Sequence, residues 1–325
     1  MHKLWILARV LVLILSWTCT PAWAQVHYPQ KPVRIIVPFP PGQATDLCAR
    51  WLADGLSKLW DQKVIVENRA GGAGIPGMLA GRDSPADGYT ITFGTSGTVG
   101  VNPSLYSKLP YAPLKDFAMV HGVFIAPVML VAHPSFPYST VTQLVEGAKK
   151  EPGKINWGYA GIGTSQHLSG ELFRFRTGID LTGVPYKGSG PMLQDLLGGQ
   201  VLLAVDTVAS ALPQIKGGKI KAIAVMSLQR MPPLPDVPTV AESGYPGLEG
   251  VGWGGLVVPM GTPVEIVEKI SGDVSKVLGE ASMRERFFER GLATDMRGPK
   301  EWTDFVRSEI QKWGEIVQKA NVKVE

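Results

Sequence analysis

The sequence is poor in cysteine and histidine, and both shortages limit its chemistry. It has two cysteines, Cys19 and Cys48, and five histidines in 325 residues. The first cysteine lies in a segment that we expect to be removed. A mature chain would then have no internal disulfide and no thiolate metal site. No histidine pair has the H-x-x-x-H or H-E-x-x-H spacing of a metal site. We therefore expect neither a bound metal nor a cofactor.

Catalytic motifs are also lacking. The chain contains no G-x-S-x-G nucleophile elbow. His167 lies near Ser165, but two residues on one helix turn do not make a nucleophile and its base. These absences predict a protein that is not an enzyme.

The chain also lacks a large excess of charge of either sign. The formal net charge is +4, and it falls to +2 without residues 1–24, because Lys3 and Arg9 leave with no acid. Such a balance favours neither nucleic acid nor an anionic membrane as a partner.

Only one long apolar run is present, and it lies at the N-terminus. Residues 1–24 have a short basic start, an apolar run from Val10 to Trp17, and the small-x-small end Ala22-Trp23-Ala24. This layout predicts a secretory signal peptide, and hence a soluble mature protein in the periplasm. The competing interpretation is lipidation of Cys19, against which the bulky Trp17 before it argues.

Strand-like and helix-like runs alternate along the rest of the chain, which is 45% apolar overall. The run "VRIIV" at residues 33–37 is followed by a helical stripe over residues 44–60, and further pairs follow to the end. Alternation of this kind predicts an α/β fold with parallel strands, and about 300 residues suffice for two lobes. Two helix starts stand out, at Thr140 with Gln143 and at Thr262 with Pro263.

A dinucleotide-binding motif is formally present. Residues 72–77 read G-A-G-I-P-G and follow the strand "KVIVE". However, residues 68–71 intervene, Pro76 falls where the helix should be running, and no acidic residue ends a second strand at the required distance. We interpret the motif as a turn that needs several positive φ angles.

What the sequence repeats is a junction between a strand and a helix. The segments "FPPGQATD" (39–46), "FGTSGTVG" (93–100) and "YAGIGTSQH" (159–167) each place glycine and small hydroxyl residues after an apolar strand, and "YKGSGP" (186–191) resembles them. Such junctions expose N–H groups at a helix N-terminus, where the helix dipole favours an anion. Four of them predict a small anionic ligand such as a carboxylate.

These segments belong to a longer series of motifs. In order, the chain contains "VRIIVPFPPG", "VIVENRAGGAG", "DGYTITFGTSGT", "YAGIGTSQHLSGELF", "VPYKGSGPMLQDLLGGQV", "LPDVPTVAESGYPG" and "VGWGGLVVPMGTP". From about Tyr28 to Ala320 it resembles the extracytoplasmic substrate-binding receptors of tripartite tricarboxylate transporters, the Bug family.

The resemblance implies a two-domain periplasmic binding protein that closes on its ligand like a Venus flytrap, with a mainly parallel sheet flanked by helices in each lobe. Lobe 1 would take residues 25–126 plus 227–325, and lobe 2 residues 127–226. Family ligands are small organic acids: di- and tricarboxylates, acidic amino acids and aromatic acids. The partners implied are membrane permease subunits, and we expect a monomer.

In the family, a ligand carboxylate lies between the loop after the first strand and a loop of the second lobe, partly through bound waters. Here the prolines fix the first turn, and Gly42 would let its backbone approach the anion closely. The family usually has Pro-Gly-Gly where this chain has Gly42-Gln43. The candidate ligand-binding residues are Phe39, Pro41, Gly42, Gln43, Asp46, Thr95, Ser96, Tyr159, Ala160, Gly161, Gly163, Thr164, Ser165, His167, Lys187, Asp206 and Trp253.

Several of these residues have two interpretations that the sequence leaves open. Asp46 could contact the ligand or cap its own helix. Lys187 could pair with a distal carboxylate or be a solvated surface residue. Asp206 could face the cleft or a hinge, Trp253 could wall the pocket or belong to the core, and Gln43 could add an amide contact or alter the turn.

The function predicted is capture of a small organic acid for a tripartite tricarboxylate transporter. One alternative is a ligand sensor that docks a membrane kinase when closed, since transport and sensing use the same closed state. The other is an exported enzyme acting on carboxylates, which the missing catalytic set disfavours. The identity of the acid stays open.

Overall fold

The computed structural model describes residues 28–42 and 44–319, so the expected signal peptide (1–24) and Gln43 lie outside the described residues. Within these residues the strands join in the order β2-β1-β3-β9-β4-β7-β5-β6, with β8 and β10 also paired to β4. The strands are β1 (Val33–Val37), β2 (Val64–Asn68), β3 (Thr90–Thr95), β4 (Phe117–Ala132), β5 (Asn156–Tyr159), β6 (Thr182–Pro185), β7 (Leu203–Thr207), β8 (Lys221–Val225), β9 (Val251–Pro259) and β10 (Ala293–Thr294).

Helices connect most of these strands, as the alternating pattern predicted. The helices are α2 (Ala44–Trp60), α3 (Ile75–Arg82), α4 (Asn102–Leu105), α5 (Pro113–Asp116), α6 (Val141–Lys150), α7 (Ser165–Thr177), α8 (Ser189–Leu197), α9 (Val208–Lys216), α10 (Val264–Gly279), α11 (Ala281–Glu289) and α12 (Pro299–Lys319), with the short turns η1 (Gly72–Gly74) and η2 (Ser96–Val101). The α/β fold class is confirmed.

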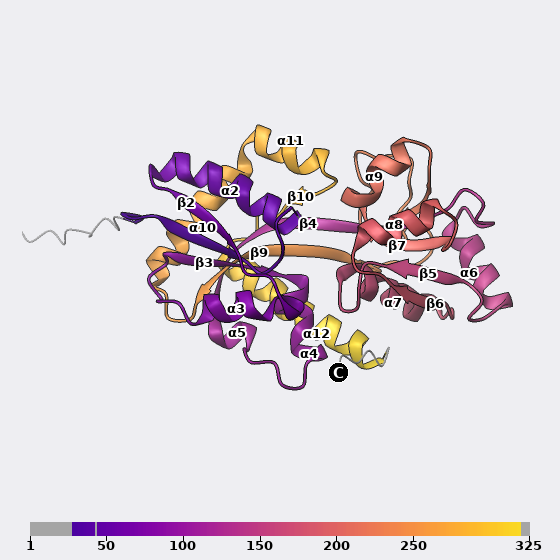
Figure 1. Ribbon diagram of the computed structural model, residues 1–325, viewed down its shortest axis with the longest axis horizontal. Coiled ribbons are helices and arrows are strands. Elements are labelled where there is room, and N and C mark those ends of the chain that lie inside the picture. The colour runs from indigo at the N-terminus through magenta and orange to yellow at the C-terminus, as the bar shows by residue number, and fades with distance from the viewer. Residues whose placement is uncertain (1–27, 43, 320–325) are drawn as a thin grey trace, which may run out of the picture.

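The long strand β4 divides the sheet into two halves (Figure 1). From Phe117 to Pro127 it pairs with β9, and from Val128 onward it pairs with β7 and β8. The first half contains β1, β2, β3, β9 and β10, and the second half contains β5 to β8. Parallel ladders lie toward the ends of the sheet, where β1 pairs with β2 and β3, and β5 with β6 and β7. The ladders around β4 and β9 are antiparallel.

Helices cover both faces of each half. In the first half α2, α10 and α11 lie on one face, and α3, α5 and α12 on the other (Figure 1). In the second half α8 and α9 lie on one face, and α6 and α7 on the other. Helix α2 shows why: its buried residues Cys48, Leu52 and Leu56 recur every four positions and form one apolar stripe.

Two segments pack across the boundaries expected from the sequence. Met231 and Leu234 belong to the core on the α8–α9 face of the second half, and Val240 and Leu248 to the core on its other face. The end of α12, which contains Trp313, also packs into that second core, beside α7. The chain therefore re-enters the first half only as β9 begins.

One helix start differs from its prediction. Helix α10 has Pro263 as its N-cap, and Thr262 donates its hydroxyl to the carbonyl of Pro259 instead of capping the helix. The other predicted start is confirmed, since Thr140 accepts from the N–H of Gln143. The reason for the difference is that Thr262 closes the turn after β9 before the helix begins.

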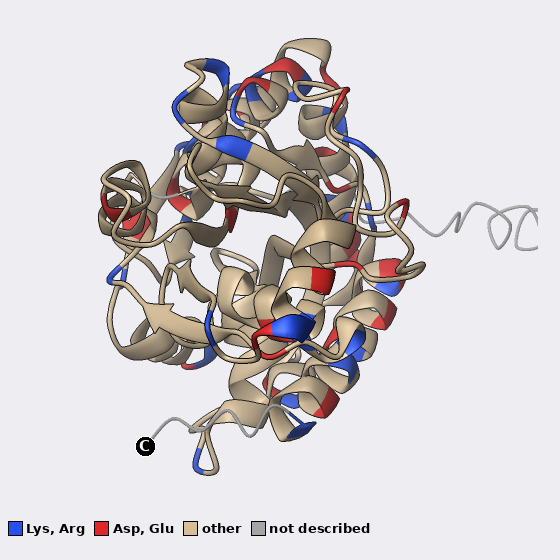
Figure 2. Ribbon diagram, turned by 90° about the vertical axis from the view of Figure 1, so that its right-hand side faces the viewer, with Lys and Arg blue, Asp and Glu red and all other residues tan. Residues whose placement is uncertain are grey.

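Charged residues of both signs lie interspersed on the outer helices and loops (Figure 2). No helix of the part that the structure describes is both long and apolar enough to cross a membrane.

Candidate functional site

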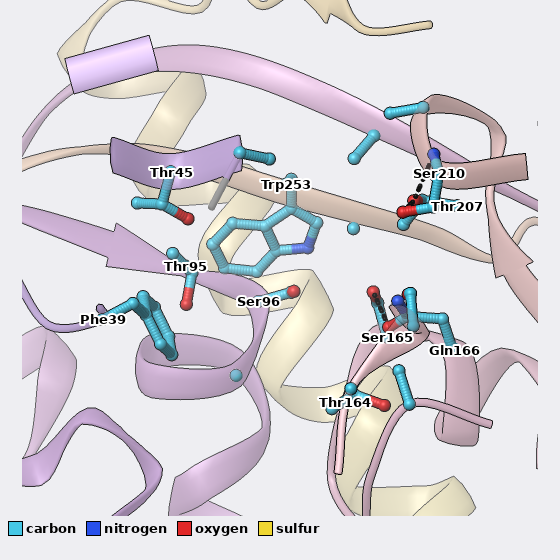
Figure 3. Close-up of a pocket in the computed structure, with 18 of the residues that line it drawn as sticks. Phe39, Thr45, Thr95, Ser96, Thr164, Ser165, Gln166, Thr207, Ser210 and Trp253 are labelled. Atoms are coloured by element: carbon cyan, nitrogen blue, oxygen red, sulfur yellow. Dashed lines mark hydrogen bonds between the residues drawn. The ribbon is translucent and has the colours of Figure 1, made fainter. Parts of the chain in front are cut away.

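A cavity of about 640 Å³ lies between the two halves. This volume is within the range of small-molecule sites. Strand-to-helix junctions from both halves line it, and Figure 3 shows Thr45, Thr95 and Ser96 on one side of the space and Thr164, Ser165, Thr207 and Ser210 on the other. The predicted residues that line it are Phe39, Gly42, Thr95, Ser96, Ala160, Gly163, Thr164, Ser165 and Trp253.

Other predicted residues stand behind this lining or away from it. Exposed Lys187 is one of them, although its neighbour Gly188 lines the cavity. Gln43 is outside the described residues, so its amide contact stays a prediction. The described candidates that do not line the cavity are Pro41, Asp46, Tyr159, Gly161, His167, Lys187 and Asp206.

Asp46 holds the turn after β1 by hydrogen bonds on the side away from the cavity. Its Oδ2 accepts from the N–H of Gly42 and from Nε of Arg50, both at 2.9 Å, and its Oδ1 accepts from Nδ2 of Asn68 at 2.8 Å. Burial by itself would raise the pKa of Asp46, but the hydrogen bonds from Arg50 and Gly42 outweigh it and hold that pKa below its usual value. The carboxylate therefore has a structural role, and the Gly42 N–H is already occupied. The other amides of this junction begin at Ala44, the first residue of α2.

The turn after β3 is closed by two threonines. Thr95 accepts from the N–H of Thr98, and the N–H of Thr95 donates to the Thr98 hydroxyl at 2.9 Å. This reciprocal cap begins η2 and places Ser96 and Gly97 on the cavity wall.

The turn after β5 has the same design in the second half. The N–H of Gly163 donates to Nδ1 of His167 at 3.2 Å, and the Thr164 hydroxyl donates to the carbonyl of Gly161 at 2.7 Å. Gly161 and Gly163 have φ values of 132° and 77°, which side chains rarely adopt. The turn is thus held from the first turn of α7, and its outer residues face the cavity.

His167 is a neutral support for this turn. Its ring stacks on Tyr159 with centroids 4.3 Å apart and is nearly parallel to Trp157 beyond it. Burial and then the nearby charge of Arg174 lower the pKa of His167 to about 4. At neutral pH the ring is therefore neutral, and because its Nδ1 accepts from the N–H of Gly163, its one proton lies on Nε2.

Asp206 stands behind the wall that α8 and α9 form. Its Oδ1 accepts from the Ser189 hydroxyl at 2.6 Å and from the N–H of Thr207 at 2.8 Å, while Oδ2 is buried without a hydrogen-bond partner among the described residues. Burial raises the pKa of Asp206 to about 6, although Ser189, Thr207 and the nearby side chain of Gln166 act to lower it. Asp206 thus fixes two residues that do line the cavity.

Trp253 belongs both to the cavity and to the core. It is only 1% exposed, and its indole N–H donates to Oε2 of Glu309 at 2.6 Å. The ring packs edge-on against Trp302 with centroids 5.3 Å apart. Because its N–H is occupied, Trp253 offers the cavity an apolar surface at its base (Figure 3).

Several lining residues were not identified from the sequence. Those with a polar or charged side chain include Thr45, Asn102, Gln166, Ser189, Thr207, Ser210 and Arg290. One signal was available, since residues 203–210 read as a strand followed by Thr and Ser before a helix, a further junction of the predicted kind. The structure shows that Thr207 caps α9 by accepting from the N–H of Ser210. No such signal existed for Arg290, which follows a helix end.

The glycine-rich segment after β2 is a turn, as interpreted. Gly71, Ala73 and Gly74 have positive φ angles. A side chain at Gly77 would stand 2.7 Å from the Cα of Pro38, so this glycine lets α3 approach the end of β1. Elsewhere, no group of three acidic, histidine or cysteine residues in residues 28–42 and 44–319 could hold a metal ion.

The sequence is similar to those of known proteins. The chain matches the family model "Tripartite tricarboxylate transporter family receptor" over residues 48–322. It is 36% identical over 298 residues to Protein BugT of Bordetella pertussis, which covers 91% of each chain.

Two solved structures resemble it over most of their length. The periplasmic binding protein BugD is 36% identical, with a TM-score of 0.77 over 92% of this chain and 100% of that one. Rpa4515 of R. palustris, solved with adipate, is 35% identical, with a TM-score of 0.81 over 91% of this chain and 99% of that one. Since both the sequence match and the two-half architecture agree, the chain belongs to the family of tripartite tricarboxylate transporter receptors, whose members are substrate receptors and not enzymes.

Proposed function

We propose that this protein captures a small organic acid in the cavity between its halves and delivers it to a tripartite tricarboxylate transporter. The observation that carries the proposal is the convergence of helix N-termini on a cavity without acidic side chains. Residues in the first turn of α2, α7, α8 and α9 line it, from both halves of the molecule.

Each of these helix ends favours an anion. The first N–H groups of a helix have no partner within it, and the aligned peptide dipoles place about half a positive charge there. No aspartate or glutamate lines the cavity among the described residues, and the carboxylate of Asp46 in the first turn of α2 binds Gly42, Arg50 and Asn68 behind the wall. A carboxylate fits them because it accepts several charge-assisted hydrogen bonds at once. The adipate held by the similar Rpa4515 supports the same ligand class.

We further propose that the two halves are lobes that close on the ligand. Strand β4 changes partners between Pro127 and Val128, which supports the expected first boundary. The packing of residues 231–248 favours a second boundary at Gly250, so lobe 2 would take 127–250 and not end at 226. Only β4 and the return into β9 would then serve as a hinge.

We also propose where the protein acts and with which partners. Residues 1–24 would export the chain to the periplasm, where it would act as a monomer. The partners would be the membrane permease subunits of the transporter, which the family description supports.

The test begins with a thermal-shift screen of organic acids, because a ligand at about 100 times its Kd adds about 2.7 kcal/mol to stability. Calorimetry then compares each acid found with its neutral amide. We expect the amide to bind at least about tenfold more weakly, since it loses the charge-assisted bonds. Equal affinity for acid and amide would refute the carboxylate assignment.

A pair of variants places the site. Gly190 lines the cavity, has an ordinary helical φ and has open space at its Cβ position. Gly190→Glu should weaken binding at least about tenfold relative to the isosteric Gly190→Gln, because it sets an anion against an anion. Gly272 of α10 is equally open but faces solvent, so Gly272→Glu is the matched control and should bind normally.

A further inference from the structure

Arg290 is the one charged side chain among the described residues that line the cavity. The wall is otherwise made of small, hydroxyl, amide and apolar residues. The wall therefore includes one residue with a full positive charge besides the helix ends, and no acidic residue to balance it.

The backbone holds Arg290 at this position. Arg290 ends α11, where its N–H donates to the carbonyls of Phe287 and Phe288. The next residue, Gly291, has a φ of 65°, and a side chain there would lie 2.9 Å from the backbone nitrogen of Ala209. Beyond it, β10 pairs with β4. The segment is thus fixed at both ends and pressed against the start of α9.

The guanidinium has no partner in the part of the chain that the structure describes. The ion pairs there include Arg297 with Asp295, but none involves Arg290, and no hydrogen bond from its side chain is found. The end of α11 accounts for a cation at this point, because the dipole is negative at a helix C-terminus. This dipole effect explains a positive charge here, but it gives the five N–H donors of the guanidinium no hydrogen-bond acceptor.

We infer that Arg290 is a specificity-determining residue that binds a second anionic group of the ligand. The inference rests on the proposed function, in which the helix N-termini bind the first carboxylate. A wall that carries a full cation besides those helix ends suits a dianion better than a monoanion. Trp253 and Leu292 supply apolar surface in the same cavity, so the ligand would carry its two charges on an apolar body.

The test compares dicarboxylates with their own monoamides by calorimetry. The probes are succinate, glutarate, adipate and pimelate, each beside the monoamide of the same length. The native protein should prefer the dicarboxylate that it binds best over its monoamide by about tenfold or more. Arg290→Gln should weaken the dicarboxylate to the level of the monoamide and leave the monoamide unchanged. Arg290→Lys, which keeps the charge but not the fork, should retain part of the preference.

Arg286→Gln is the matched control, because Arg286 lies on the same helix, is exposed and does not line the cavity. Higher ionic strength should reduce the preference of the native protein, since Arg290 is exposed. Equal losses for dicarboxylate and monoamide in Arg290→Gln would show that Arg290 binds the first carboxylate, and would overturn the inference alone. So would an unchanged preference. Failure of every acid to bind the native protein would overturn the proposed function with it.

Discussion

Two of the turns at the cavity, one in each half, are fixed in the same way but by different chemistry. In the turn after β1 the N–H of Gly42 donates to Asp46, and in the turn after β5 the N–H of Gly163 donates to His167. In both, the acceptor lies four residues on, in the first turn of the following helix. A side chain of the helix thereby fixes the glycine turn that precedes it.

The difference lies in charge. Asp46 is an ionised carboxylate that also holds Arg50 and Asn68, whereas His167 is a neutral ring stacked on Tyr159. The first turn therefore depends on electrostatics, and the second depends on aromatic packing and on the absence of a proton. The comparison shows that a binding turn can be rigid without a charge, provided that a buried acceptor stands behind it.

The largest effect on stability is expected for the charged support. Asp46→Ala removes the acceptor of three donors and should lower the free energy of unfolding by about 3 kcal/mol, measured by urea denaturation. Asp54→Ala, an exposed position on the same helix, is the control and should change it little. If Asp46→Ala lowers the free energy of unfolding by less than His167→Phe does, Arg50 and Asn68 hold the turn without the carboxylate.

The neutral support should contribute less than the charged one at neutral pH, and its contribution should fall in acid. His167→Phe keeps an aromatic ring on Tyr159 but deprives the N–H of Gly163 of its acceptor, at a cost of about 1–2 kcal/mol at pH 7.

The pH dependence gives a second measurement on the same variant. The pKa of His167 falls from 6.5 to about 4 on folding, so the unfolded chain binds the proton more readily. The native protein should therefore lose about 3 kcal/mol through this residue as the pH falls from 6.5 to 4. Asp206, whose pKa rises to about 6, has the opposite slope below that pH. The difference between native protein and His167→Phe isolates the histidine, and parallel pH curves would contradict the neutral role.

The smallest effect on the free energy of unfolding is expected for Thr164, which contacts both Gly161 and His167 in the turn after β5. Thr164 accepts from the N–H of His167 and donates to Gly161. Thr164→Val should cost about 1 kcal/mol of unfolding free energy, and Thr164→Ser should restore most of it. A Ser variant as unstable as the Val variant would indicate that the methyl group, and not the hydroxyl, holds the turn.

Much of the local structure could be read from the sequence. The apolar run over residues 33–37 predicted β1, and the apolar stripe over residues 44–60 predicted α2 with both of its ends. The glycine and hydroxyl junctions predicted that helices follow them, although α7 begins at Ser165, within residues 161–167, which the sequence predicted to be a loop. These predictions succeeded because helix period, strand burial and turn chemistry are properties of neighbours in the chain.

Other parts depended on contacts between distant residues. The sequence predicted that the backbone at Gly42 approaches the anion, but it did not indicate that the N–H of Gly42 donates to Asp46, which also accepts from Asn68 of another strand. Asp206 was placed at the cleft or a hinge, yet it stands behind Ser189 and fixes it. Thr262 matched the pattern of a helix cap, but its hydroxyl donates to the carbonyl of Pro259 in the turn after β9.

The sequence by itself determined the order of strands and helices, the family and the kind of junction that faces the cavity. The tertiary structure decided which junctions meet, and it alone brought the end of α11 to the start of α9. Arg290 and Ala209 are far apart in the chain, and a positive φ at Gly291 lets their segments touch. A charge placed by such packing leaves no local pattern, because periodicity records only what lies within a few residues.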